Sequence, residues 1–488
     1  MKLKYIIISL ITILFMHQAV NAQDFTIHNT TSSYQNHFGW DISGSGSYCC
    51  ISDPRDSISD YGNGSVSIYQ KNGTQWTFYQ NIHKANPTPF GLFGYQTSMS
   101  FNYLAITELG DTTKGFMSGS VSLYKLSNQT WTFMQKITPQ DSSRTMYFGE
   151  SLKLIGDYLF IGTSNIDSGS VFVYKLDNGL FKLKQQINSP LNRDFEFGKV
   201  LTATKDFLFV GAPATNNPNL RGSVHIYRLS NQHWISDTIF TVNQTQVGSC
   251  FGASLSSSSN TLVIGAPHTT VNNGNEEIYF SGAAYICSYT NSIWSYNPNP
   301  LINNNPNGHD LFGSKVAIKD SLIFITSPRK DIANKDDGVI YMYRYSQSNW
   351  QQDTLYSPSQ STIYFGNNIF VLNNQLIVST GGEKQEKNKG LVFVFNIQDL
   401  INNGLNSNYK TIDGIHIYPN PAASIINISI EKNTKYKLQI YSSEGKLVKT
   451  GTIQKTTSIN IDKLKSGIYI VSLESSEGIF TQRIIIQH

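Results

Sequence analysis

Two stretches of the sequence decide the fold, "FGKVLTATKDFLFVGAP" at residues 197–213 and "FGASLSSSSNTLVIGAP" at residues 251–267. In both, a Phe-Gly pair is followed by a strand-like run, a polar turn and a returning apolar run, a pattern that predicts a β-hairpin. The hairpin recurs along the chain, because Phe-Gly pairs that are followed by this pattern begin at Phe38, Phe93, Phe148, Phe197, Phe251, Phe312 and Phe365. Fourteen residues after each Phe, a Gly, Ser or Thr ends the apolar run, so the chain is built from internal repeats.

Each copy continues with two further predicted strands. The third starts at a recurring glycine, as in "GSVSIY" at 64–69, and an aromatic residue twelve positions later opens the fourth strand. The aromatic residues are Trp76, Trp131, Phe181, Trp234, Trp294 and Trp350, whereas Asn402 takes this position in the last copy. Since they recur at one position, we expect them to pack between repeats rather than form a sugar-binding platform.

The repeats predict an all-β, seven-bladed β-propeller over residues 23–400. A single four-stranded meander cannot bury both of its faces, whereas radial closure of several such sheets buries them and leaves only short edges. A linear β-solenoid is the structural alternative, although solenoid repeats are usually shorter than the 49–61 residues that separate the Phe-Gly pairs here.

The segment "DFTIH" at 24–28 precedes the first copy and alternates polar and apolar residues. In complete copies the fourth strand ends on an apolar residue 10 or 11 positions before the next Phe-Gly pair, and Ile27 lies 11 positions before Phe38. We therefore expect residues 24–28 to supply the missing fourth strand of the last blade and to close the ring. The alternative is that the Asn-rich segment 401–410 supplies this strand.

The N-terminus has the pattern of a secretory signal peptide over residues 1–22. Lys2 and Lys4 precede the apolar run "YIIISLITILFM", and small residues occur near Ala22. No later stretch predicts a transmembrane helix, so we expect no membrane-spanning segment after signal cleavage. The signal contributes +2 and residues 414–488 contribute +4 to a net charge of +4, which leaves −2 for residues 23–413. A mildly acidic body gives no electrostatic basis for binding nucleic acid.

The Phe-Gly…Gly-Ala-Pro units resemble the FG-GAP repeats of the integrin α-subunit propeller over about residues 23–398. That family consists mostly of adhesion and ligand-binding proteins, with some enzymes. Many family repeats carry a D-x-D-x-D-G calcium loop, but the fixed spacing here leaves only a turn, and no copy has the acidic ligands. We therefore expect no cofactor; calcium at "NNNPNG" (303–308) or "DSISDYGNG" (56–64) is the alternative.

Residues 414–488 predict a small β-sandwich after a linker at 401–413, because alternating strands are separated by turn residues. The segments "IHIYPNPAASIINIS" (415–429), "KLQIYSSEGKLVKTG" (437–451), "INIDKLKSGIYIVSLES" (459–475) and "QRIIIQH" (482–488) resemble the C-terminal sorting domain of type IX secretion cargo in Bacteroidota. The resemblance implies secretion or attachment to the outer-membrane surface. It also implies two partners, the type IX machinery and a sorting peptidase. A binding sandwich of the immunoglobulin type is the alternative.

Catalytic motifs are missing from the sequence. It has no P-loop, H-E-x-x-H, C-x-x-C or G-x-S-x-G pattern, so we expect neither catalytic residues nor a metal site. The four cysteines, Cys49, Cys50, Cys250 and Cys287, are expected to be small buried hydrophobic residues, with no histidine at a suggestive position. A disulfide between Cys250 and Cys287 remains open.

The segment between the second and third strands varies most in length between copies, and loops on a rigid scaffold are where binding usually occurs. Aromatic and charged residues in these loops are the candidate ligand-binding residues: Arg55, Asp60, Tyr61, Phe116, Tyr279, Phe280, Arg329 and Asp336. The sequence thus predicts a secreted or surface adhesion protein for a protein or glycan ligand. The alternatives are a polysaccharide lyase or hydrolase that uses loop carboxylates, and a structural component of the cell surface.

Overall fold

The computed structural model describes the chain from residue 23 to residue 486, with internal gaps. They are 29–36, 57–61, 74, 85, 87–88, 141–146, 165–168, 191–194, 216, 218, 243–247, 273, 275, 333, 347–348, 360–361, 384–389, 403–414, 419–421, 431–433, 443–446 and 476–477. The predicted signal peptide and residues 403–413 of the predicted linker therefore lie outside the described residues. One compact unit covers residues 21–400, and another contains residues 401–488.

The first unit consists of antiparallel four-stranded sheets, which we call blades. The first three are β2 (Ile42–Ser45), β3 (Tyr48–Asp53), β4 (Ser65–Asn72) and β5 (Gln75–Ile82); β6 (Phe93–Ser100), β7 (Tyr103–Glu108), β8 (Ser120–Ser127) and β9 (Thr130–Ile137); β10 (Ser151–Ile155), β11 (Tyr158–Thr163), β12 (Ser170–Asp177) and β13 (Leu180–Asn188). The next three are β14 (Val200–Ala203), β15 (Phe207–Ala212), β16 (Ser223–Ser230) and β17 (His233–Thr241); β18 (Ser254–Ser258), β19 (Thr261–Ala266), β22 (Ala283–Thr290) and β23 (Ile293–Tyr296); β24 (Val316–Lys319), β25 (Leu322–Ser327), β26 (Val339–Ser346) and β27 (Asn349–Tyr356).

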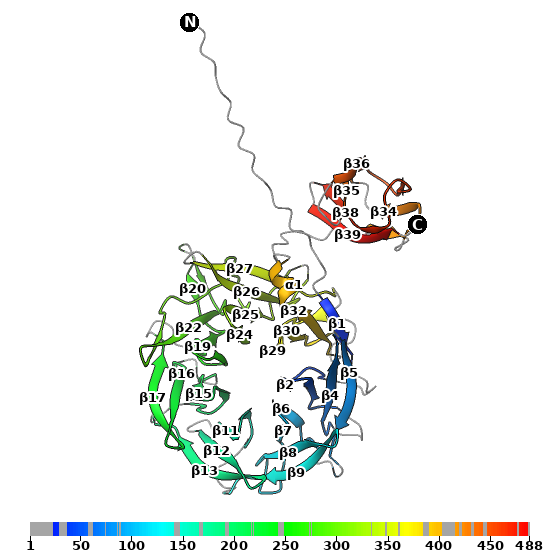
Figure 1. The fold of residues 1–488 in the computed structure, drawn as a ribbon. Helices are drawn as coiled ribbons and strands as arrows, with labels where there is room; N and C mark the ends of the chain where they lie inside the picture. The colour runs from blue at the N-terminus through cyan, green and yellow to red at the C-terminus, as the bar shows by residue number, and fades with distance from the viewer. Residues whose placement is uncertain are drawn as a thin grey trace. The chain divides into compact units, whose positions relative to one another are not determined.

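The last sheet joins the two ends of this unit. Its order is β29 (Asn368–Leu372), β30 (Gln375–Ser379), β32 (Val392–Asn396) and then β1 (Gln23–Ile27). In Figure 1 the blades are arranged radially, with the first strand of each blade towards the centre. Each innermost strand lies against the next one, and β29 lies against β2, so the ring is closed. This arrangement confirms the predicted all-β propeller fold.

The Phe-Gly pairs hold neighbouring blades together. All seven Phe side chains are at most 2% exposed. The glycine that precedes each third strand lies against the Phe carbonyl of the following pair: a Cβ on Gly282 would lie 2.0 Å from the Phe312 oxygen. The contact recurs where the ring closes, because a Cβ on Gly390 would lie 1.8 Å from the Phe38 oxygen. Only glycine allows this approach of two backbones, which explains why it recurs at this position.

Strand β1 closes the ring by pairing antiparallel with β32, with Ile27 opposite Val392. The Ile27 side chain is 2% exposed and belongs to a core cluster that includes Phe38 and Ile42 of the first blade. Trp76 Nε1 also donates a hydrogen bond of 3.1 Å to Gln375 Oε1 across the same junction. The interface between the last and the first blade is thus packed and hydrogen-bonded like the interfaces between consecutive blades.

The recurring aromatic residues pack between blades, as the sequence predicts. The ring pairs are Tyr48–Trp131, Tyr103–Phe181, Tyr158–Trp234 and Phe207–Trp294, with centroids 5.3–5.8 Å apart and planes close to perpendicular. Edge-to-face geometry of this kind is favourable for aromatic pairs. In each pair the first ring belongs to the second strand of the preceding blade.

Three small features interrupt the regular pattern. A short helix, α1 (Ile397–Asn402), follows β32 and includes Asn402, the residue at the aromatic position of the last copy. The hairpin β20 (Val271–Asn272) and β21 (Glu277–Ile278) lies in the longest loop, and β28 (Thr362–Ile363) pairs with β31 (Gly382–Glu383). The helix was not predicted, because its six residues are too few to give a periodic pattern.

The second unit has two antiparallel sheets with one shared core. One sheet consists of β33 (Ile415–Tyr418), β34 (Ile425–Ile430) and β37 (Thr457–Asn460); the other has the order β36 (Leu447–Ile453), β35 (Tyr436–Ser442), β38 (Gly467–Ser475) and β39 (Gly478–Ile486). Ile428 of the first sheet and Ile440 and Val471 of the second are fully buried in the same cluster. The predicted small sandwich is therefore observed.

Candidate functional site

Loops between second and third strands emerge at the same end of the blades as the connectors that lead to the next blade, and we call this end the loop face. Backbone hydrogen bonds fix each loop to the following connector: Tyr147 N donates to Met117 O (3.0 Å), and Tyr364 N donates to Asp336 O (2.8 Å). Phe280 occupies the equivalent position in the longest loop and accepts from Leu311 N at 3.1 Å. The loop face is therefore a continuation of the rigid ring.

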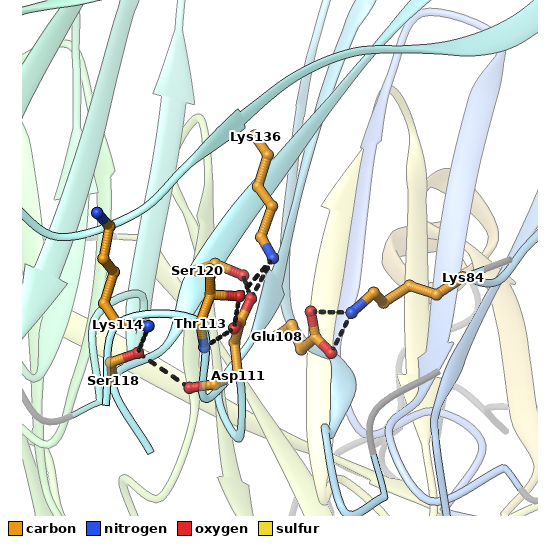
Figure 2. Close-up of polar contacts among 8 residues, drawn as sticks. All are labelled: Lys84, Glu108, Asp111, Thr113, Lys114, Ser118, Ser120 and Lys136. Atoms are coloured by element: carbon orange, nitrogen blue, oxygen red, sulfur yellow. Dashed lines mark hydrogen bonds and ion pairs between the residues drawn. The ribbon is translucent and has the colours of Figure 1, made fainter. Parts of the chain in front are cut away.

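Buried ion pairs also hold the loops in place, as Figure 2 shows for the second blade. Lys84 Nζ, from the preceding connector, donates to both Glu108 carboxylate oxygens at 2.6 and 2.7 Å. Asp111 pairs with Lys136 and accepts hydrogen bonds from Ser120 Oγ and the Thr113 backbone and hydroxyl groups. Burial alone would raise the pKa of Asp111, but these partners outweigh it and hold the pKa below its usual range.

Two other loop carboxylates, Asp56 and Asp53, have similar structural partners. Asp56 accepts a hydrogen bond of 2.6 Å from Ser65 Oγ, the counterpart of the bond from Ser120 to Asp111. Asp53 accepts bonds from the backbone of His37 and Arg55, and burial raises the pKa of this carboxyl group to about 7. These carboxylates support the loops from below and are not presented at the surface.

Aromatic and basic side chains from two blades converge on the loop face at Phe280. The Phe280 ring, which is 37% exposed, lies between the imidazoles of His268 and His309, with centroid distances of 5.0 and 5.2 Å. His309 N donates to Tyr279 O at 3.0 Å, which fixes the connector beside the loop. Burial lowers the pKa of His268, and the charges of Arg329 and His309 lower it further, so the His268 imidazole is mainly neutral near pH 7. We call Tyr279, Phe280, His268, His309 and Arg329 the Phe280 cluster.

A thiol lies beneath this cluster, beside a histidine that spacing in the sequence does not point to. Cys250 Sγ lies 3.2 Å from His268 Nδ1. The two residues belong to different segments that are joined by the bond from His268 N to Ser249 O, which the sequence does not reveal. Burial, with the charge of Glu196, raises the pKa of Cys250 to about 11, so the thiol stays protonated and is a poor nucleophile.

All four cysteines are free and buried, so the open possibility of a Cys250–Cys287 disulfide is not realised. Their burial agrees with the expectation that they act as small hydrophobic residues.

The remaining predicted site residues are spread around the loop face. Arg55 is exposed in the first blade, and Phe116 is 79% exposed in the second. Asp336 lies in the sixth blade, where its backbone N donates to Asp331 Oδ1. Asp60 and Tyr61 lie outside the described residues. Of these residues, the structure therefore brings together Tyr279 and Phe280, with Arg329 near enough to lower the pKa of His268. It adds His268 and His309, which the sequence alone does not single out.

The loop at 303–308, one of the two calcium look-alikes, binds a cation of the chain itself. Lys330 Nζ donates to the Asn305 carbonyl at 2.9 Å and to Asp310 Oδ2 at 2.8 Å, and both charged side chains are less than 10% exposed. The oxygens that could face calcium thus already hold an ammonium group. The other look-alike, 56–64, is described only in part. Among the described residues, no group of three His, Cys, Asp or Glu side chains is placed to hold a metal ion.

Near the centre of the ring, polar residues replace the apolar core. Asp41 accepts hydrogen bonds from Thr97 N and Oγ1 at 2.7 and 2.8 Å. Burial raises the pKa of Asp41 and lowers the pKa values of Lys153 and Lys315, and the opposite charges counteract these shifts. This cluster joins the inner strands of several blades electrostatically.

Family models match two parts of the chain. Residues 416–487 match the secretion system C-terminal sorting domain, and residues 131–174 match the FG-GAP repeat. The latter match extends from Trp131 in β9 to Tyr174 in β12, so it contains one Phe-Gly junction. The chain therefore carries both of the elements that its sequence resembles. No curated protein matches the chain at a significant level.

Solved structures similar to the chain include a β-propeller domain of very different sequence. The β-propeller domain of the Trilobed protease from Pyrococcus furiosus is 10% identical, with a TM-score of 0.43 over 74% of this chain and 95% of that one. A 6-phosphogluconolactonase candidate from Bacteroides uniformis is 12% identical (TM-score 0.43; 65% and 85% covered). A study of two prolyl endopeptidases supplies a chain that is 8% identical (TM-score 0.46; 91% and 54% covered). Within the described residues, no helix is long and apolar enough to cross a membrane.

Proposed function

We propose that the protein is a binding protein that engages a protein or glycan ligand through the loop face of its propeller. Its sorting domain indicates that the protein is secreted or attached to the outer surface, and implies interaction with the secretion machinery. An FG-GAP repeat suggests a binding role. Export by a signal at residues 1–22 and removal of residues 414–488 by a sorting peptidase are parts of the proposal.

The observation that carries the proposal is the Phe280 cluster. It combines two partly exposed aromatic rings, Tyr279 and Phe280, with two imidazoles and the Arg329 guanidinium on segments that backbone hydrogen bonds hold in place. Aromatic and arginine side chains on a rigid surface contribute most of the binding energy in many interfaces. The positive charge of Arg329 favours a ligand that carries a carboxylate, phosphate or sulfate group near an apolar surface.

The loop carboxylates support a binding role more than a hydrolytic one. A glycosidase needs two carboxyl groups that flank its substrate. Glu108, Asp111 and Asp310 are each less than 4% exposed and paired with lysines of the chain, so their charges are already neutralised. A polysaccharide-active enzyme would have to use carboxylates other than these.

A screen of the purified protein on immobilised acidic glycans, neutral glycans and extracellular proteins tests the proposal. We expect a binder whose affinity falls at least about 30-fold in the Phe280→Ala, Arg329→Ala double variant, since interface anchors contribute about 2 kcal/mol or more. Phe101→Ala, at a 73% exposed ring in a turn at the other end of the blades, is the control and should bind normally. Equal binding by the double variant, or depolymerisation of a glycan by the wild type, would reject the proposal.

A further inference from the structure

The packing between blades departs from the paired-ring pattern at the junction of the fifth and sixth blades. At four other junctions, the ring that opens the fourth strand is 1–4% exposed. It packs against Tyr48, Tyr103, Tyr158 or Phe207 of the preceding blade. These four residues lie ten positions after the Phe of their Phe-Gly pairs, and in the fifth blade that position holds Thr261. Trp350, which should pack there, is partly exposed.

A pocket of about 260 Å³ occupies the space where the missing ring would lie. Trp350 and Tyr345 form one side, with ring centroids 5.1 Å apart, and Tyr345 is 57% exposed. Ile286 and Ile323 add apolar surface, while the polar groups come from Thr261 and Asp320, with Ser288 and Ser321 beside them. The site therefore takes the place of a ring that the chain itself supplies at four other junctions.

We propose that this pocket binds a neutral sugar ring of a glycan. A pyranose has an apolar face of C–H groups that can pack on Trp350 and Tyr345, and hydroxyl groups that suit the hydroxyl and carboxylate groups around the pocket. A phenol or phenyl side chain of a peptide would leave most of these polar groups without a partner. The Asp320 carboxylate, whose side chain is 80% exposed, pairs with Lys319 Nζ at 2.9 Å through Oδ2. The pair carries no net charge, which suits a neutral sugar, and Oδ1 is left to accept a hydroxyl donor.

The pocket is separate from the Phe280 cluster. Asp320 and Ser321 lie in the turn between the first and second strands of the sixth blade, and Tyr345 and Trp350 flank the turn between its third and fourth strands. In an antiparallel meander these turns emerge at the end opposite the loops between second and third strands. The sugar site thus goes beyond the proposed function and does not depend on it.

A substitution taken from the repeat itself gives the test. Thr261→Tyr introduces the residue found at the same position in three other blades, so it should fill the pocket without destabilising the protein. Neutral methyl glycosides of glucose, galactose and mannose, and N-acetylglucosamine, are titrated by ligand-observed NMR at millimolar concentrations. We expect at least one to bind the wild type, and its affinity to fall at least about tenfold in Thr261→Tyr and severalfold in Asp320→Asn. The melting temperature of Thr261→Tyr should be unchanged or higher.

Three outcomes would overturn the proposal. In the first, no neutral sugar binds the wild type. In the second, the sugar binds Thr261→Tyr as well as it binds the wild type, although that variant is folded. In the third, N-acetyltyrosinamide binds at this site in preference to every sugar, which would assign the pocket to a peptide. The double variant Phe280→Ala, Arg329→Ala should retain sugar binding, which separates this site from the loop face.

Discussion

Replacement of Ile27 by alanine should destabilise the propeller far more than a change so near the start of the chain usually does. Residues close to a terminus generally contribute little unless they are docked in a sheet. Ile27 is 2% exposed and packs with Phe38, Ile42 and Val392, so the substitution removes buried methyl groups and leaves a cavity in the closing interface. Ile→Ala changes in a core cost about 2–5 kcal/mol, and we expect a value in this range.

Denaturant unfolding and amide hydrogen exchange together measure this effect. Ile293→Ala is the matched control, because Ile293 also lies in an outer strand but is 66% exposed, and it should change stability by less than about 0.5 kcal/mol. Exchange in Ile27→Ala should increase most in β32, which pairs with β1, and least in the strands of the fourth blade. A loss below about 0.5 kcal/mol for Ile27→Ala, or an exchange increase spread evenly over all blades, would refute closure by β1.

Three further predictions concern the loops and the closing interface. Gly390→Ala should destabilise the ring by about 1–3 kcal/mol or more, since its Cβ would lie 1.8 Å from the Phe38 carbonyl oxygen, and denaturant unfolding measures the loss. Lys330→Ala should cost about 3–5 kcal/mol in the same assay, because it leaves the buried Asp310 carboxylate without its partner. Burial raises the pKa of Asp53 from 3.8 to about 7, so the folded state retains a proton that the unfolded state releases, and stability should fall as pH rises from about 4 to 7. This rise corresponds to roughly 4 kcal/mol, so Asp53→Asn should flatten the pH profile of the unfolding free energy and stabilise the protein above pH 7.

Each of these substitutions has a control elsewhere in the propeller. Gly308→Ala meets only an ordinary contact at 3.5 Å, and Lys182→Ala removes an exposed ion pair, so both should change stability by about 1 kcal/mol or less. Asp206→Asn alters a carboxylate that is 61% exposed and should leave the pH profile as it is. The packing and ion-pair arguments fail if a control costs as much as its buried counterpart. The argument about Asp53 fails if Asp53→Asn retains the wild-type pH dependence.

Much of the fold could be predicted from the sequence because the same contact is made at every junction between blades. The Phe of each pair is buried and a glycine lies against its carbonyl, so both residues recur at a regular spacing in the sequence. Gly390 makes the same contact with Phe38 where the ring closes. The register likewise placed Ile27 at an outer-strand position, and β1 is the outer strand of the last sheet. Helix α1 was missed because its six residues are too few to give a periodic pattern.

The candidate site was predictable only in part, since it depends on contacts between different copies. Loop length and composition singled out Phe280 and Arg329. The ring neighbours of Phe280 are His268, which follows the end of a strand, and His309, which lies in a connector. One signal could have found His309: it lies three positions before Phe312, in a connector that runs along the preceding loop. The side chain of Cys250 could not have been paired with His268 from spacing alone.

The central claim is that ligands bind at the loop face, and a hydrogen-exchange footprint of the protein with the binder found by the array screen tests it most directly. The account predicts slower exchange in the loop at 266–282 and in the connector at 303–312, with the turns around Asp320 and Tyr345 unchanged. Protection confined to those turns, or to the sorting domain at 415–486, would contradict the claim, because the ligand would then lie away from the Phe280 cluster.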